Sequence, residues 1–123
     1  MAKYVDVYLL PIPEENIPAY REAAEKSSKI FLKHGALSYR EYVVSDLKTP
    51  EGIMPFDKAI ELKPGETLVY AAVEFESEER RNEAMKRIFE DEEMHEAMPE
   101  KPIFEMNRMI YGGFRILVDA QEK

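Results

Sequence analysis

The two halves of the chain repeat one order of predicted elements: a strand, a helix and a second strand. In the first half, residues 4–10 are rich in β-branched and aromatic side chains, which predicts a strand that Pro11 and Pro13 should end. Apolar residues then recur every three or four positions over residues 14–33, the spacing of one face of a helix. Residues 36–44 again favour a strand, so the first half contains one strand–helix–strand unit.

The second half of the chain repeats this unit. Residues 67–75 predict a strand, and Ser77 is a good N-cap for a helix whose apolar stripe runs to Phe89. A further short helical turn is expected before Pro99. Residues 106–119 predict a long last strand, which completes the second unit.

Two split units of this kind predict one ferredoxin-like α+β domain, with the order βαββαβ, over residues 1–123. Its antiparallel sheet would carry both helices on one face. A long connection, residues 46–65, joins the two units and is punctuated by prolines and glycines, although residues 55–62 favour one or two helical turns. Such a connection is either an ordered loop that covers the sheet edge or a functional lid.

The predicted strand over residues 67–75 is apolar on both faces, which a sheet with helices on one side only does not explain. Val69 and Val73 point to one side of this strand, whereas Tyr70 points to the other. Because a large exposed apolar sheet face usually marks an interface, we predict a homodimer in which two sheets close face to face as a dimeric barrel. The alternative is that residues 46–65 fold under the sheet.

Charge and composition limit the partners of the chain. Its 123 residues include 17 Lys and Arg against 25 Asp and Glu, and this formal charge of −8 makes nucleic acids and anionic membrane surfaces poor partners. The lack of cysteine excludes disulfides, thiol catalysis and thiolate metal sites. No apolar run approaches the length of a membrane span, and residues 1–6 lack the apolar core of a signal peptide. We therefore expect a cytoplasmic protein.

Three segments resemble the YbaA-like family: residues 34–41 (HGALSYRE), residues 56–63 (FDKAIELK) and, above all, residues 108–114 (RMIYGGF). This bacterial family of unknown function belongs to the dimeric α/β-barrel superfamily, and the resemblance extends from Tyr4 to Asp119. It implies a ferredoxin-like protomer and a homodimer whose two sheets form a barrel. Related branches include cofactor-independent monooxygenases, muconolactone-type isomerases, haem-dependent enzymes and stress-induced dimers, so the resemblance implies a cavity and not one mechanism.

His34 is the first candidate for chemistry, because it lies at the end of the first predicted helix. The free carbonyl groups and the negative dipole end there favour a protonated imidazole. Beside a cavity, such a group would polarise a substrate carbonyl or act as a general acid. The alternative role is structural, as the residue that caps this helix.

Charged residues in the middle of predicted strands form the second group of candidates. Five charged residues interrupt segments that otherwise favour burial, where a charge is costly unless it is paired or solvated: Asp6, Arg40, Glu41, Glu74 and Arg108. Arg40 and Glu41 must point to opposite faces of the sheet, so at most one of them faces a cavity. These residues either pair structurally, for example Asp6 with Arg108, or supply a catalytic base and an anion-binding arginine.

No cofactor or metal is predicted. The chain has two histidines, His34 and His95, and no thiolate, which argues against a zinc site. Glu92 and His95 have the spacing of a di-iron ligand pair, but such a site needs further carboxylates on other helices. The pair Gly112-Gly113 is followed by strand residues, so it predicts a bulge or a close backbone approach and not a phosphate site.

These observations predict a small-molecule-binding homodimer, with a cofactor-independent monooxygenase-like or isomerase-like enzyme as its catalytic form. We place Asp6 and Tyr8 on the face that meets the second subunit, and expect an anionic or enolate-like ligand there. The alternative function is a non-catalytic structural or stress-related interaction module. The predicted pocket lies between the sheet and residues 46–65, has His34 near its rim, and is lined by Tyr4, Asp6, Tyr8, Tyr70 and Arg108.

Overall fold

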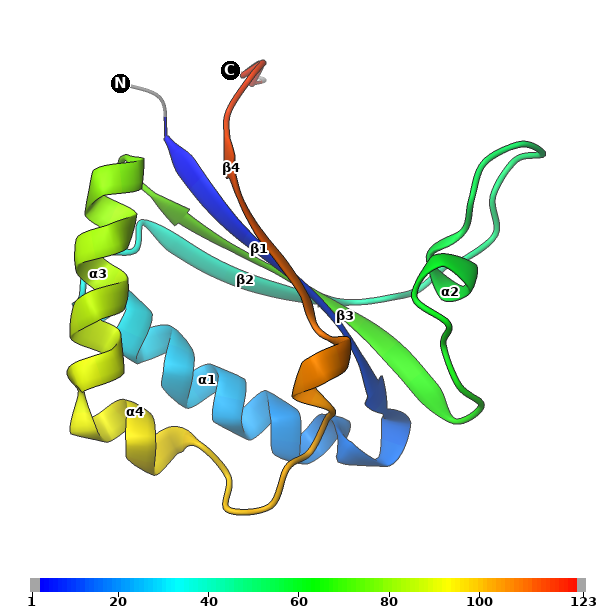
Figure 1. Ribbon diagram of the computed structural model, residues 1–123, viewed down its shortest axis with the longest axis horizontal. Helices are drawn as coiled ribbons and strands as arrows, with labels where there is room; N and C mark the ends of the chain where they lie inside the picture. The colour runs from blue at the N-terminus through cyan, green and yellow to red at the C-terminus, as the bar shows by residue number, and fades with distance from the viewer. Residues whose placement is uncertain (1–2, 122–123) are drawn as a thin grey trace.

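Four antiparallel strands form one sheet in the computed structural model, which describes residues 3–121 (Figure 1). The other residues of the predicted domain, 1–2 and 122–123, lie outside the described range. The strands stand in the order β2-β3-β1-β4, so the first strand of the chain is central and pairs with both the third and the last. The strand bounds are Tyr4–Pro13 for β1, Ser38–Val43 for β2, Glu66–Phe75 for β3 and Ile110–Arg115 for β4.

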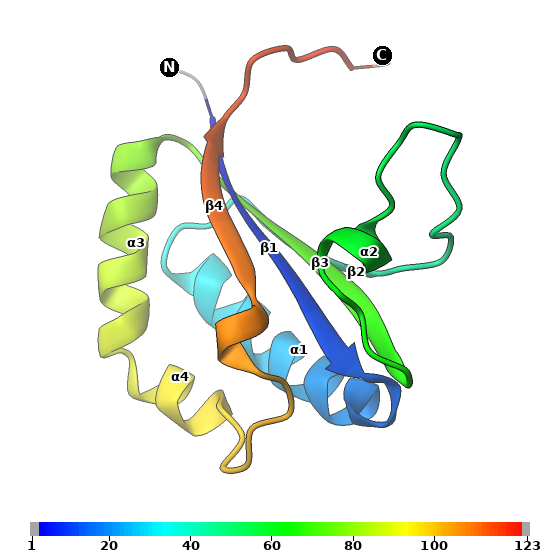
Figure 2. The same ribbon diagram turned by 45° about the vertical axis from the view of Figure 1, so that its right-hand side comes forward.

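The helices α1 and α3 cover one face of this sheet, so the ferredoxin-like α+β prediction is confirmed (Figure 1 and Figure 2). The Oγ of Ser77 accepts a hydrogen bond from the backbone N–H of Arg80, which makes Ser77 the N-cap of α3 as predicted. Within residues 3–121, no helix has the length and apolar character that crossing a membrane requires. The helices are α1 (Ile17–Lys33), α2 (Phe56–Ala59), α3 (Glu78–Glu90) and α4 (Glu92–Ala97), with 3-10 turns at Glu14–Asn16 and Met106–Arg108.

Strand β1 continues through two prolines, so the prediction that Pro11 and Pro13 end it is wrong. The backbone N–H of Glu14 donates to the carbonyl oxygen of Gly65, on the β3 side, at 2.9 Å. Because hydrogen bonding alternates along a strand, even-numbered residues of β1 bond towards β3 and odd-numbered residues towards β4. Pairing with β4 stops at Leu9, so the N–H groups that the two prolines lack would have no partner strand.

The last strand is shorter than the residues 106–119 that the sequence predicts, because β4 ends at Arg115. Arg115 pairs with Tyr4, the first residue of β1. Residues beyond Arg115 therefore have no strand to pair with, and Leu117 and Val118 are almost fully exposed. Both ends of the described chain lie at the same end of the sheet (Figure 1).

The glycine pair of β4 marks a close approach and not a bulge. Gly112 and Gly113 stand in regular register with Val7 and Asp6 of β1, so no extra residue interrupts the pairing. A Cβ on Gly113 would lie 2.7 Å from Cε2 of Tyr4. The ring of Tyr4 thus fills the space that a side chain at position 113 would need.

The hydrophobic core lies between the sheet and the helices α1 and α3. Val73 and Phe75 of β3 pack there with Phe31 of α1 and Ile88 of α3. Phe75 and Val73 are almost completely buried. Tyr8 of β1 packs against the same cluster, so this face of β1 also belongs to the core.

Asp6 and Tyr8 face the helices, which corrects the predicted assignment of the two faces of β1. Asp6 is in register with the core residue Val73, and its side chain has no exposed surface. Residues in register share one face of a sheet, so this side of β1 cannot meet a second subunit. The prediction failed because β1 carries apolar side chains on both faces, and alternation alone does not say which face meets the helices.

The opposite face of the sheet, which we call the open face, carries exposed apolar side chains. The rings of Tyr42 on β2 and Tyr70 on β3 lie 5.5 Å apart there, and Ile110 and Phe114 of β4 share this face. Each of these four residues keeps at least 39% of its surface exposed. This is the second apolar face that the sequence of β3 predicts.

The connection between β2 and β3 covers only one end of the open face. Its short helix α2 lies on the side of the sheet opposite α1, beside the first part of β3 (Figure 1 and Figure 2). Ile60, just after α2, is buried, and so are Pro11 and Leu68, which belong to the open face by alternation. The connection therefore shields the end where β1 stops and β3 begins, and it leaves Tyr70 exposed.

Replacing Gly113 by alanine should destabilise the fold more than the same change at Gly112. The new Cβ at position 113 would overlap the ring of Tyr4, whereas at position 112 it would meet only the exposed Phe114 ring at 3.3 Å. We expect Gly113→Ala to lower the free energy of unfolding by about 1–3 kcal/mol, the usual cost of overpacking. Urea denaturation measures both variants, and equal losses would contradict the tight fit of Tyr4.

Candidate functional site

Polar and aromatic side chains form a row on the helix-facing side of the sheet. Tyr8 of β1 is in register with Tyr111 of β4 and with Ala71 of β3, and Ala71 is in register with Glu41 of β2. Because residues in register share one face, this row crosses all four strands beneath the helices. One polar cluster lies at the β2 end of this row, around Glu41 under α1. A second cluster lies beside the row, around Asp6 under α3.

The first cluster joins Glu41 to two tyrosines, and we call it the Glu41 cluster. Oε1 of Glu41 accepts a hydrogen bond from the hydroxyl of Tyr20 on α1, and Oε2 accepts one from Tyr39 at 2.5 Å. Burial, followed by the nearby carboxylate charge, raises the pKa of Tyr20 and of Tyr39 far above the ordinary value for tyrosine. Both hydroxyl groups therefore stay protonated and donate to the carboxylate.

A cavity of about 420 Å³ opens between α1 and the outer edge of β2, and the Glu41 cluster forms its polar part. On its rim, Arg21 and Glu25 of α1 form an ion pair in which Nε and Oε1 are 3.3 Å apart. The apolar walls come from both α1 and the sheet, and they include Ile17, Ala24, Val43 and Val69. The cavity thus has apolar walls and one half-buried end of polar oxygens.

The second cluster surrounds Asp6 beneath α3. Its Oδ1 accepts hydrogen bonds from Nη1 of Arg81 at 2.8 Å and from the hydroxyl of Tyr111 at 3.1 Å. The Arg81 guanidinium also donates to the hydroxyl of Tyr4 at 3.2 Å and lies 4.7 Å from the centroid of that ring. Burial raises the pKa of Asp6, and the Arg81 charge opposes this shift. Oδ2 of Asp6 is buried and has no hydrogen-bond partner within residues 3–121.

Arg108 pairs with Glu66 and not with Asp6, so the predicted Asp6–Arg108 pair is wrong. Its Nη1 lies 2.6 Å from Oε2 of Glu66, and its Nη2 lies 3.0 Å from Oε1. Nη2 also donates to the carbonyl oxygen of Glu61 at 3.0 Å. The hydrogen bonds from Arg108 hold the pKa of Glu66 below its ordinary value. Arg108 therefore ties the turn before β4 to the beginning of β3.

His34 follows the last residue of α1, and its ring is also paired. Nε2 of His34 lies 2.6 Å from Oδ2 of Asp91, the N-cap residue of α4. Oδ1 of Asp91 accepts a hydrogen bond from the backbone N–H of Glu93 at 2.8 Å. Mainly through the hydrogen bond with His34, the pKa of Asp91 falls to about 2. This pairing supports the structural alternative for His34, because it joins the end of α1 to the start of α4.

The pocket predicted between the sheet and the long connection is wrong, because its lining residues lie on different sides of the sheet. Tyr70 is in register with Leu9 and lies on the open face. The three predicted residues of β1 alternate with Leu9 and face the helices. Of the predicted set, the structure joins only Tyr4 and Asp6, which share the guanidinium of Arg81.

Four residues of the two clusters escape the sequence-based prediction: Tyr20, Tyr39, Arg81 and Tyr111. Tyr20 belongs to the apolar stripe that predicts α1, so its spacing marks it as a core residue. Tyr39 shares a face of β2 with Glu41, and this alternation is a signal that could have paired them. Arg81 stands 75 residues from Asp6 along the chain, and no local pattern connects the two.

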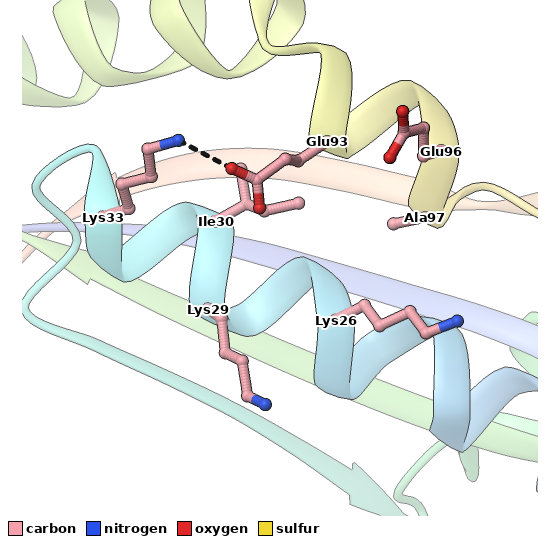
Figure 3. Close-up of a pocket in the computed structure, with 7 residues that line it drawn as sticks. All are labelled: Lys26, Lys29, Ile30, Lys33, Glu93, Glu96 and Ala97. Carbon is pink, nitrogen blue, oxygen red and sulfur yellow. Dashed lines mark hydrogen bonds and ion pairs between the residues drawn. The ribbon is translucent and has the colours of Figure 1, made fainter.

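A second hollow, of about 480 Å³, lies between α1 and α4 (Figure 3). Three lysines of α1 and two glutamates of α4 line it, and Nζ of Lys33 lies 3.0 Å from Oε1 of Glu93. Figure 3 shows Lys29 pointing away from α4. The charged side chains are exposed, so this hollow is a solvated groove between two helices and not part of the candidate site.

Glu92 and His95, whose spacing resembles a metal-ligand pair, both lie on α4. Nε2 of His95 lies 3.0 Å from the carbonyl oxygen of Phe89. Across residues 3–121, no three His, Asp or Glu side chains gather closely enough to hold a metal ion.

The fold and the two clusters define a ferredoxin-like α+β protein with titratable side chains enclosed between its sheet and its helices. The chain belongs to the family described as "Protein of unknown function (DUF1428)", whose model matches residues 3–106. It is 36% identical over 118 residues to the uncharacterized protein YbaA of Escherichia coli strain K12, a match that covers 95% of this chain and 98% of that protein. The resemblance to the YbaA-like family is therefore confirmed.

Solved structures at low sequence identity share this fold. A nipsnap family protein of unknown function from Agrobacterium tumefaciens superposes with a TM-score of 0.61 at 14% identity, over 94% of this chain and 88% of that one. A dimeric ferredoxin-like protein from an uncultured marine organism gives 0.57 at 11% identity, over 99% and 100%. A Bacillus cereus protein named "Putative Antibiotic Biosynthesis Monooxygenase" gives 0.56 at 18% identity, also over 99% and 100%.

Replacing Asp91 by asparagine should destabilise the protein in a pH-dependent way. Asparagine still caps α4 but carries no charge, so the variant loses the carboxylate that faces His34 and Lys33. The pKa of Asp91 is lowered from 3.8 to about 2, so its contribution to stability is complete above about pH 4 and disappears as the pH falls towards 2.

The measurement is the difference in unfolding free energy between wild type and Asp91→Asn, taken across this pH range. The difference should be larger at about pH 5 than at pH 2 and should shrink as the pH falls below 4. Glu90→Gln, which removes an exposed carboxylate next to Asp91, is the matched control and should show no such trend. A difference for Asp91→Asn that does not change with pH would contradict the ion pair.

Proposed function

We propose that the protein is a homodimer that binds a small molecule in the cavity between α1 and β2 of each subunit. One observation carries the proposal: the carboxylate of Glu41, held by two tyrosine hydroxyls, is the half-buried polar end of a cavity with apolar walls. Small-molecule sites have this composition, with apolar walls and a few placed polar groups. The volume of about 420 Å³ also falls within the roughly 300–1,000 Å³ of such sites.

The open face supports the homodimer. Large contiguous apolar patches are uncommon on soluble monomers. In a dimer with two-fold symmetry, each copy would cover this patch on the other copy. Arg40 of β2 and Glu74 of β3 also lie on this face, one cation and one anion. Two copies related by a two-fold axis can therefore place each of these charges near its opposite. The similar ferredoxin-like protein from a marine organism is itself dimeric, which favours the same assembly.

The catalytic form of the proposal is an enzyme that acts without a cofactor. Its support is the likeness in fold to the Bacillus cereus protein with a monooxygenase name, together with a half-buried carboxylate that lines the cavity. In this form Glu41 is the base that takes a proton from the bound substrate, and Tyr20 and Tyr39 orient its two oxygens. Asp6, His34 and Arg108 stay structural, because each is paired elsewhere in the fold.

Replacing Tyr70 by aspartate should separate the subunits. A carboxylate without a partner in a closed sheet interface costs several kcal/mol, whereas the wild-type dimer should bury at least about 1,200 Å². In analytical ultracentrifugation we expect wild type at twice the 14.3 kDa chain mass and Tyr70→Asp at the monomer mass. Phe89→Asp changes a more exposed aromatic residue of α3, outside the open face, and should remain dimeric.

The dimer would be disproved by a 14.3 kDa wild-type species at micromolar concentration. A dimeric Tyr70→Asp variant with an unchanged melting temperature would instead remove Tyr70 from the interface.

Filling the cavity should abolish ligand binding without unfolding the protein. Val43 is an exposed wall residue on β2, so a tryptophan there should extend over the cavity without disturbing the core, and strands tolerate tryptophan. In a thermal-shift screen of small aromatic compounds, those that raise the melting temperature of wild type should not raise that of Val43→Trp. Leu117→Trp, at an almost fully exposed position outside the cavity, is the control and should respond like wild type.

A further inference from the structure

The hydrogens of the Glu41 cluster are all used within the cluster. A tyrosine hydroxyl has one hydrogen, and those of Tyr20 and Tyr39 point to the two oxygens of Glu41. The raised pKa of both tyrosines keeps these hydrogens in place. A ligand can therefore use only the lone pairs of the two hydroxyl oxygens and of the carboxylate, which accept hydrogen bonds. The polar end of the cavity can therefore accept hydrogen bonds but cannot donate them.

The charged residues that line the cavity also favour a ligand that donates hydrogen bonds and carries no negative charge. Arg21 is the cation that lines the cavity, and it is paired with Glu25 on the rim. Among the contacts of residues 3–121, no lysine or arginine forms an ion pair with Glu41. An anionic ligand would thus meet an unbalanced negative charge, which favours its exclusion.

The arginines that the sequence offered for an anionic ligand are engaged elsewhere. Arg81 binds Asp6 under α3, and Arg108 binds Glu66 at the beginning of β3. Neither lines the cavity between α1 and β2. At this site the predicted anionic or enolate-like ligand would therefore meet Arg21, which is already paired with Glu25, and the unpaired charge of Glu41.

We propose that the ligand of this cavity is a neutral or cationic aromatic compound that carries a hydrogen-bond donor, such as a hydroxyl or an ammonium group. This inference rests on the proposed function and names its ligand class. The donor group binds the oxygens of the Glu41 cluster, and the aromatic body packs against Ile17, Val43 and Val69. Anionic compounds of the same size are rejected by the Glu41 charge.

Four compounds that share one ring system and differ only in their polar group test the proposal. They are 1-naphthalenemethanol, 1-naphthylmethylamine, 1-naphthoate and 1-methylnaphthalene, and their affinities can be measured by isothermal titration calorimetry. The alcohol and the amine should bind wild type at least about tenfold more tightly than the naphthoate, as expected for a hydrogen bond to a charged group. They should also bind more tightly than 1-methylnaphthalene, which lacks a donor.

The variant Glu41→Gln tests whether the charge of the Glu41 side chain, and not its size, selects the ligand. The amide has nearly the same size but no charge and brings its own N–H donors, so the amine should lose about tenfold in affinity and the naphthoate should gain. Glu96→Gln, which makes the same change in the groove between α1 and α4, is the matched control and should bind all four compounds like wild type. Circular dichroism shows whether each variant is folded.

The outcomes distinguish the inference from the proposed function. If naphthoate binds wild type as tightly as the alcohol does, and Val43→Trp abolishes that binding, the cavity is a ligand site but the proposed ligand class is wrong. If none of the four compounds binds, or if Val43→Trp binds them like wild type, the proposed function itself fails at this cavity. Selective binding of the alcohol and amine that depends on Glu41 supports both.

Discussion

The buried carboxylate of Asp6 is the interaction on which the packing of α3 against the sheet depends. It lies on the central strand with no exposed surface, and Arg81 of α3 and Tyr111 of β4 bind its one satisfied oxygen. Losing one partner of a buried pair costs about 3–5 kcal/mol, so α3 takes the position that brings Arg81 to Asp6. Gly113 completes this arrangement, because only a residue without Cβ leaves space for the ring of Tyr4 under the guanidinium. One cation thereby connects α3, β1 and β4.

The element order of this fold could be predicted because its signals are local, whereas the errors come from long-range pairing. Caps such as Ser77 and the helical spacing of α1 are visible within a few residues. Pro11 and Pro13 look like a strand end from the same local evidence, but β1 continues because β3 still pairs with it and β4 does not. The faces of β1 were exchanged for a related reason: the partner of Asp6 is far away in sequence.

Less of the candidate site than of the fold could be predicted. Alternation places Arg40 and Glu41 on opposite faces, which the register confirms, yet only the helices decide that Glu41 is the inward one. Tyr20 reaches Glu41 because α1 crosses beneath β2, a relation between two elements that no spacing in the sequence encodes. The polar end of the candidate cavity and the open face consequently lie on opposite sides of one sheet, and Tyr42 of the edge strand β2 contributes to both.

The order of the strands also affects how the protein is made. Among the described elements, β1 is synthesised before all the others and β4 after them, although the two are neighbours in the sheet. Contacts between such distant segments form late, and unpaired strand edges invite aggregation in the meantime. After β3 has paired with β1, the other edge of β1 stays unpaired until β4, which ends at residue 115, has been synthesised. Pro11 and Pro13 remove two N–H groups from that waiting edge, which makes the nascent chain a poorer template for strands of other molecules.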